Sequence, residues 1–172
     1  MNSFAHWLYA TAPSAFIRSH EVWMLPTIQS VHILGIATAV GSAFMIAMRV
    51  MGWLGADQTL GQTTRRYGPW LTGALWLLLL TGGLLVLAEP PRALDTVSFW
   101  LKMALVALVA MVAVVFQRSM RSQEPAWGAG AVPAGVRWTA AATFLVWIAI
   151  IILGRLIAYD QIWGRVFPGL KA

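Results

Sequence analysis

Four apolar stretches, each long enough to cross a lipid bilayer as a helix, occupy more than half of this chain of 172 residues. They cover residues 27–53, 67–88, 99–116 and 138–158. A helix rises 1.5 Å per residue, so about 20 apolar residues span the roughly 30 Å of hydrocarbon in a bilayer. The sequence therefore predicts an all-α integral membrane bundle of four transmembrane helices. We divide the chain into an N-terminal segment over 1–25 with a short interfacial helix, one transmembrane domain over 26–160, and a C-terminal tail over 161–172.

Composition narrows the classes of function. Only 10% of residues are charged, whereas ordinary soluble domains carry about 25%. The absence of cysteine excludes disulfides, thiolate catalysis, iron–sulfur clusters and cysteine-based zinc sites. The net charge of +6 is explained by basic residues beside membrane spans, which contact anionic head groups. We therefore expect the lipid bilayer and other membrane protein subunits as partners, and no nucleic acid.

The arginines predict an orientation in the membrane. Six of them flank the first and third connections between spans, whereas the second connection contains only Arg92. The six are Arg49, Arg65, Arg66, Arg118, Arg121 and Arg137. Short loops rich in arginine stay in the cytoplasm, so both termini are expected on the periplasmic side of a bacterial inner membrane.

Small residues predict how the helices pack. They recur along the first span as Gly35, Ala39 and Ala43, and along the third and fourth spans as alanines, whereas the second span contains the leucine run 77–80. Small residues let helices approach closely inside a membrane. The first, third and fourth spans are thus expected to form a tight core, with the second span facing lipid. Pro26 is expected to open the first span, because proline suits the first turn of a helix.

Three cationic side chains at membrane depth are the principal site candidates. His32 lies in the first span, Lys102 near the start of the third and Arg155 near the end of the fourth. With the predicted orientation, all three fall in the outer half of the membrane, near Gln29. Intramembrane ionisable residues are costly and usually functional. A cationic pocket there would suit the propionates of haem b or the head group of a quinone.

Structural explanations for the same residues stay open. Lys102 and Arg155 lie near helix ends, where long side chains extend to the membrane surface. His32 could form a hydrogen bond between helices without any ligand.

The histidines also allow two metal hypotheses. The chain has only His6, His20 and His32. His20 and His32, across a bend at Pro26, could ligate one haem. The same three histidines with Met24 could instead bind copper, which imidazole and thioether ligands suit. Neither a Ser–His–Asp set, nor an acidic pair at membrane depth, nor a phosphate-binding loop is visible, which favours a protein without catalytic activity of its own.

Five short segments together resemble a family of small, four-helix bacterial inner-membrane proteins described only as a domain of unknown function. The segments are 14–19 (SAFIRS), 23–26 (WMLP), 32–35 (HILG), 99–103 (FWLKM) and 154–159 (GRLIAY). The resemblance extends over about residues 4–159 and implies a bundle and a membrane location. The layout is also distantly similar to the membrane part of CopD-type copper-resistance proteins. Relatives of that type carry a histidine at the inner end of the third span, where this chain has Gln117.

Three functional hypotheses follow. The chain is an accessory subunit of a periplasm-facing redox or electron-transfer complex, a membrane protein that handles copper or another metal, or a structural scaffold subunit without a catalytic role. We favour the first, because Lys102 and Arg155 would repel a bound copper ion. A quinone or haem would not be repelled in this way.

Overall fold

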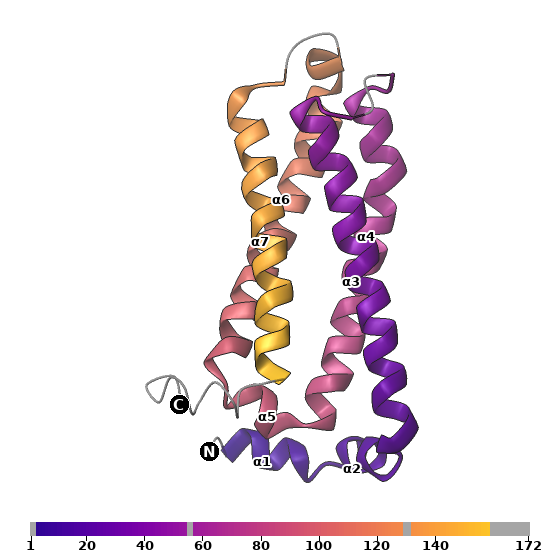
Figure 1. Ribbon diagram of the computed structural model, residues 1–172, viewed down its shortest axis with the longest axis vertical. Coiled ribbons are helices and arrows are strands. Elements are labelled where there is room, and N and C mark those ends of the chain that lie inside the picture. Colours follow the sequence, from indigo (N-terminus) through magenta and orange to yellow (C-terminus); the bar gives the residue numbers. More distant parts are fainter. Residues whose placement is uncertain (1–2, 55–56, 129–131, 159–172) are drawn as a thin grey trace.

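The computed structural model describes residues 3–54, 57–128 and 132–158, and most of them are helical. The helices are α1 (Ser3–Tyr9), α2 (Ala12–Ser19), α3 (Glu21–Met51), α4 (Leu60–Ala88), α5 (Pro90–Leu94), α6 (Val97–Gly128) and α7 (Ala134–Ala158). The four long helices α3, α4, α6 and α7 run side by side as an elongated bundle (Figure 1). Each contains a stretch long and apolar enough to cross a membrane. The predicted all-α bundle of four transmembrane helices is thus confirmed.

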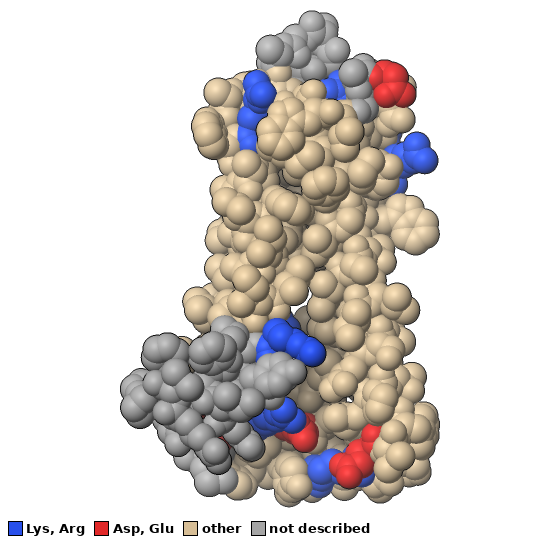
Figure 2. Space-filling model, viewed as in Figure 1, with Lys and Arg blue, Asp and Glu red and all other residues tan. Residues whose placement is uncertain are grey.

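Charged side chains lie toward the two ends of the bundle. On the face shown in Figure 2, the middle of the molecule presents a continuous band without lysine, arginine, aspartate or glutamate. Such a band matches the hydrocarbon interior of a bilayer, in which charged groups are costly. The chain is therefore a multi-pass membrane protein.

The N-terminal segment forms two short helices rather than one. Together with α5, the helices α1 and α2 lie across the end of the bundle where α7 finishes (Figure 1). Pro13 lies in the first turn of α2, where its missing N–H removes no helical hydrogen bond. Arg18 of α2 donates a hydrogen bond to the buried Ser14, and its guanidinium lies 3.6 Å from the centre of the Tyr9 ring in α1. This contact joins the two short helices.

The first transmembrane helix begins earlier than expected. Helix α3 starts at Glu21, so Pro26 lies inside it rather than opening it. A proline at this depth removes one hydrogen bond close to the helix end. The loss is small there, because the carbonyls of the first turns lie near the membrane surface and its water.

The packing of α4 also differs from the expectation. Helix α4 packs most extensively against α3, and the apolar stretch of α4 is 22% buried, whereas those of α6 and α7 are each 11% buried. The reason is a fit between shapes: a Cβ placed on Gly35 of α3 would lie 3.1 Å from Cδ2 of Leu78 and 3.5 Å from Cδ2 of Leu77. The leucines of α4 thus fill the depression that the small residues of α3 create. The second span is part of the core, and α6 and α7 are the more exposed pair.

At the opposite end of the bundle, two arginines organise the chain. Gly52, in the left-handed region with a φ of 79°, ends α3, and Thr59 begins α4 with a capping box to Gln62. Arg49 donates from Nε to the Gln58 carbonyl oxygen at 2.7 Å. Arg137 of α7 donates from Nη2 to the Met51 carbonyl oxygen at 3.0 Å. Because cations stabilise the C-terminal end of a helix, these arginines hold the end of α3 against α4 and α7.

Replacing Gly35 with valine should destabilise the bundle, because its added methyl groups would overlap Leu78. Overpacking a core costs about 1–3 kcal/mol, which we expect as a lower thermal unfolding temperature in detergent. Gly41→Val is the matched control, since Gly41 lies on the same helix and a Cβ there meets no atom within 4 Å. Equal unfolding temperatures for the two variants would contradict this account of the α3–α4 contact.

Candidate functional site

A hydrogen bond inside the bundle fixes the imidazole of His32. Its Nδ1 lies 2.7 Å from the hydroxyl oxygen of Thr81, a buried residue of α4. The same hydroxyl donates to the Leu77 carbonyl oxygen at 2.7 Å. A threonine hydroxyl has one proton, so its oxygen must accept from His32. The neutral imidazole therefore carries its proton on Nδ1 and presents a lone pair on Nε2.

The His32 ring lies against a glycine of the neighbouring helix. A Cβ placed on Gly82 of α4 would lie 3.5 Å from Cε1 of the ring, the carbon between the two nitrogens. Thr81 thus holds Nδ1 of the ring, and Gly82 lies beside Cε1 at a distance where a Cβ would make an ordinary van der Waals contact. His32 itself is half-buried.

Lys102 makes the corresponding arrangement on the other helix pair. Its side chain crosses from α6 to α7, because a Cβ placed on Gly154 would lie 3.2 Å from Nζ and 3.6 Å from Cε. At 1.5 Å per residue, Thr81, Lys102 and Gly154 lie about 10, 8 and 6 Å from the near ends of their helices. The structure therefore places His32 and Lys102 at one level of the bundle.

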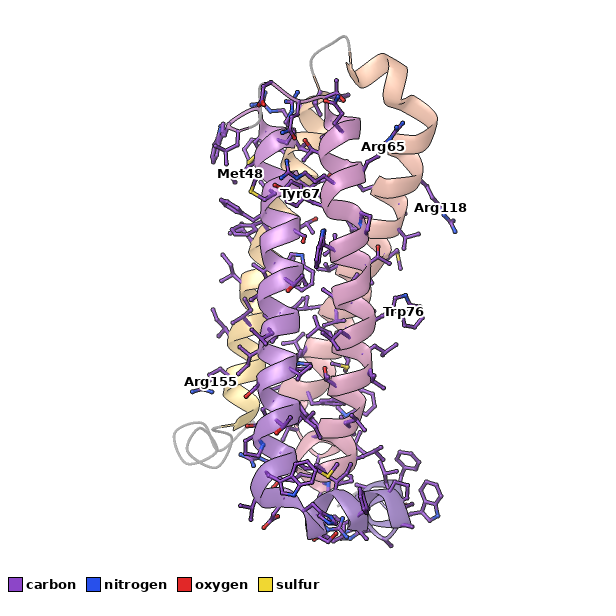
Figure 3. All side chains as sticks on the ribbon, turned by 90° about the vertical axis from the view of Figure 1, so that its right-hand side faces the viewer. Met48, Arg65, Tyr67, Trp76, Arg118 and Arg155 are labelled. Atoms are coloured by element: carbon purple, nitrogen blue, oxygen red, sulfur yellow. The ribbon has the colours of Figure 1, made fainter. Side chains whose placement is uncertain are left out.

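Arg155 is not brought into this pair. It follows Gly154 on α7, is exposed, and projects away from the bundle in Figure 3. Gln29 lies one turn before His32 on α3 and is exposed as well. Of the predicted cationic pocket, the structure thus places His32 and Lys102 at one level inside the bundle, while Arg155 and Gln29 are exposed.

The other predicted ligands lie apart from His32. His20 immediately precedes α3 and is exposed, with its Nδ1 2.9 Å from the Ser19 hydroxyl oxygen. Since α3 continues through Pro26, the twelve residues from His20 to His32 correspond to about 18 Å of helix. One haem iron needs both ligands within bonding distance, and the structure does not place them so.

The predicted copper ligands are likewise dispersed. His6 is exposed on α1, and Met24 lies about 12 Å along the helix from His32. Among the side chains that the structure describes, no three of histidine, aspartate or glutamate are grouped as a metal site would require.

Two glycines of the site were not identified from the sequence as its parts. Gly82 and Gly154 matter because they face His32 and Lys102 from neighbouring helices. The available signal was a glycine at the same membrane depth as each polar residue.

The chain matches no protein-family model, no characterised protein and no solved structure with which it was compared.

Thr81→Val should release the tautomer of His32, because valine keeps the shape of threonine but has no oxygen to accept from Nδ1. An interhelical hydrogen bond in a membrane contributes about 0.6 kcal/mol on average, so the variant should fold and lose little stability. Nitrogen NMR of the imidazole should show the Nδ1–H form in the wild type and a mixture in the variant. Thr81→Ser should resemble the wild type, and an unchanged spectrum in Thr81→Val would disprove the assignment.

Proposed function

We propose that this protein is a membrane subunit of a periplasm-facing electron-transfer complex, and that His32 and Lys102 bind the head group of a quinone. The observation that carries the proposal is an oriented lone pair on Nε2 of His32 at the same level of the bundle as the Lys102 ammonium donor. The two lie between apolar helices at one depth of the membrane.

The two groups complement the two redox forms of a quinone. The Lys102 ammonium can donate a hydrogen bond to a quinone carbonyl oxygen, and charge-assisted bonds of this kind are the stronger ones. Nε2 of His32 can accept a hydrogen bond, and then the proton, from a quinol hydroxyl. Nδ1–H stays bonded to Thr81 during that transfer, so the ring needs no rotation. Oxidation of the quinol to the quinone would also release a second proton, to water at the membrane surface, and two electrons, to a redox centre of the partner subunits; reduction of the quinone would take up the same particles.

The quinone is favoured over the other cofactors by the composition of the site. Bis-histidine haem takes a second imidazole from a facing helix, whereas the sequence has no histidine after His32. A copper ion at His32 would be repelled by the Lys102 ammonium. The resemblance to the small four-helix family is compatible with such a subunit and does not specify its activity.

A scaffold subunit is the second candidate function, and the His32–Thr81 hydrogen bond favours it. That bond links α3 to α4 and would stabilise a bundle without any ligand. It does not account for Lys102, whose ammonium has no carboxylate partner in the described part of the chain. A leucine at this position would pack as well without the cost of burying a charge.

Quinone binding distinguishes the two functions. We expect the purified protein to bind a water-soluble short-chain ubiquinone, and Lys102→Met to bind it about 10- to 100-fold more weakly, because hydrogen bonds to charged groups contribute about 1.5–3 kcal/mol. Arg66→Gln is the control, since Arg66 lies in the first turns of α4 at the opposite end of the bundle. A reduced-minus-oxidised spectrum of the same sample tests for haem. Affinity that is equal in all three proteins would contradict the proposal.

The orientation belongs to the same proposal: both termini face the periplasm and the α3–α4 connection faces the cytoplasm. Because the chain has no cysteine, single cysteines can report this directly. We expect Ser3→Cys to react with a membrane-impermeant maleimide in spheroplasts, and Asp57→Cys to react only after lysis, both positions being exposed. The reverse pattern would invert the topology and place the His32–Lys102 site on the cytoplasmic side.

A further inference from the structure

The other half of the bundle contains an apolar cavity of about 480 Å³. It lies between α3, α6 and α7, and Leu71 of α4 contributes to its wall. It shares no residue with the His32–Lys102 site. The nearest part of α3 in its wall, Ala43, is about 16 Å along the helix from His32. The volume is within the range of ligand-binding cavities, about 300–1,000 Å³.

Small residues create the cavity. Ala43 and Ala47 of α3, Ala113 of α6 and Ala140 of α7 all line it. On the sequence alone, such residues predict close helix approach. Here no leucine from a neighbouring helix fills the space, as Leu78 does at Gly35. Methyl groups from three helices therefore face a space that this part of the chain leaves open.

The walls select an apolar occupant. The lining is almost entirely aliphatic or aromatic, and its two hydroxyls already donate their protons to backbone carbonyl oxygens. Thr139 donates to Gly135 at 2.9 Å, and Thr143 donates to Thr139 at 2.7 Å. Water needs two to four polar partners in a buried site, and a charged ligand would be left without hydration or a counter-ion. Neither suits this cavity.

We propose that the cavity binds an acyl chain of a membrane phospholipid, which enters sideways from the bilayer. Met111 and Val115 of α6 line the cavity and are also 64% and 57% exposed on the outer surface of the bundle. They therefore form the rim of an opening toward the lipid. Protein interiors are densely packed, and an unfilled space loses dispersion contacts. Hydrocarbon is the medium at this depth of the membrane, so it is the material available to fill the space.

Filling the cavity with a side chain should displace the lipid. We would purify the protein in mild detergent and measure bound phospholipid per chain by native mass spectrometry. The wild type should retain phospholipid, and Ala140→Phe should retain about tenfold less, equivalent to a loss of about 1.4 kcal/mol. Ala142→Phe is the matched control, because Ala142 lies on the same helix with its side chain exposed, and it should retain phospholipid as the wild type does.

Equal retention in Ala140→Phe and Ala142→Phe would overturn the proposal, as would a wild type that retains no phospholipid. Retention of an isoprenoid quinone in place of phospholipid would overturn the choice of an acyl chain. None of these results depends on the His32–Lys102 site, so the proposed function and this binding site can fail separately.

A second measurement tests the cavity of the wild type without filling it, and a variant only identifies the signal of one tryptophan. Trp147 lines the cavity and is only 3% exposed, so bulk lipid reaches it only through the cavity. We would compare the wild type and Trp147→Phe in vesicles of phosphatidylcholine with brominated or ordinary acyl chains. The fluorescence of Trp147 is the emission of the wild type minus that of Trp147→Phe, and we expect the brominated chains to quench this difference. A difference of equal size in the two kinds of vesicle would show that no acyl chain reaches Trp147.

Discussion

The structure depends on one constraint: polar groups at membrane depth must find partners within the protein, because hydrocarbon offers none. The threonines of the spans show the usual solution, in which the hydroxyl donates to the carbonyl oxygen one turn earlier, as in Thr38 and Thr143. Thr81 does the same and in addition accepts from His32. The constraint therefore determines which nitrogen of the imidazole carries the proton, and hence which nitrogen is available to a ligand.

The helices associate through shape complementarity, because lipid tails are as apolar as the helix surfaces and the hydrophobic effect does not drive helices together inside the bilayer. Gly35 and Leu78 show where the complementarity is complete, and this contact joins α3 and α4 into the better-buried pair. Ala43 and Ala140 show where it is incomplete, and a cavity remains between α3, α6 and α7. Small residues thus have opposite consequences in the two halves of the bundle. What differs is whether a facing helix supplies a side chain large enough to fill the space.

The sequence could predict the features that depend on position along a helix. Hydropathy and a fixed rise per residue located the four spans and placed His32 and Lys102 at a common depth. It could not predict features that depend on rotation about a helix axis. A helix that is apolar all round has no polar stripe to show which side faces the core. For this reason the outward projection of Arg155 and the packing of Leu78 against Gly35 of α3 became visible only in the structure.

The glycines beside the two polar side chains bear on what the site is for. If His32 and Lys102 served packing alone, the bundle would gain more from apolar residues, which need neither a hydrogen-bond partner nor space for a charge. Instead α4 provides Gly82 at the imidazole and α7 provides Gly154 at the ammonium. A Cβ at position 82 would only contact the imidazole at 3.5 Å, whereas one at position 154 would lie 3.2 Å from Nζ and require the ammonium to shift slightly. A lone pair and a charged donor at one depth are what the proposed quinone head group would use, whereas helix association alone requires neither.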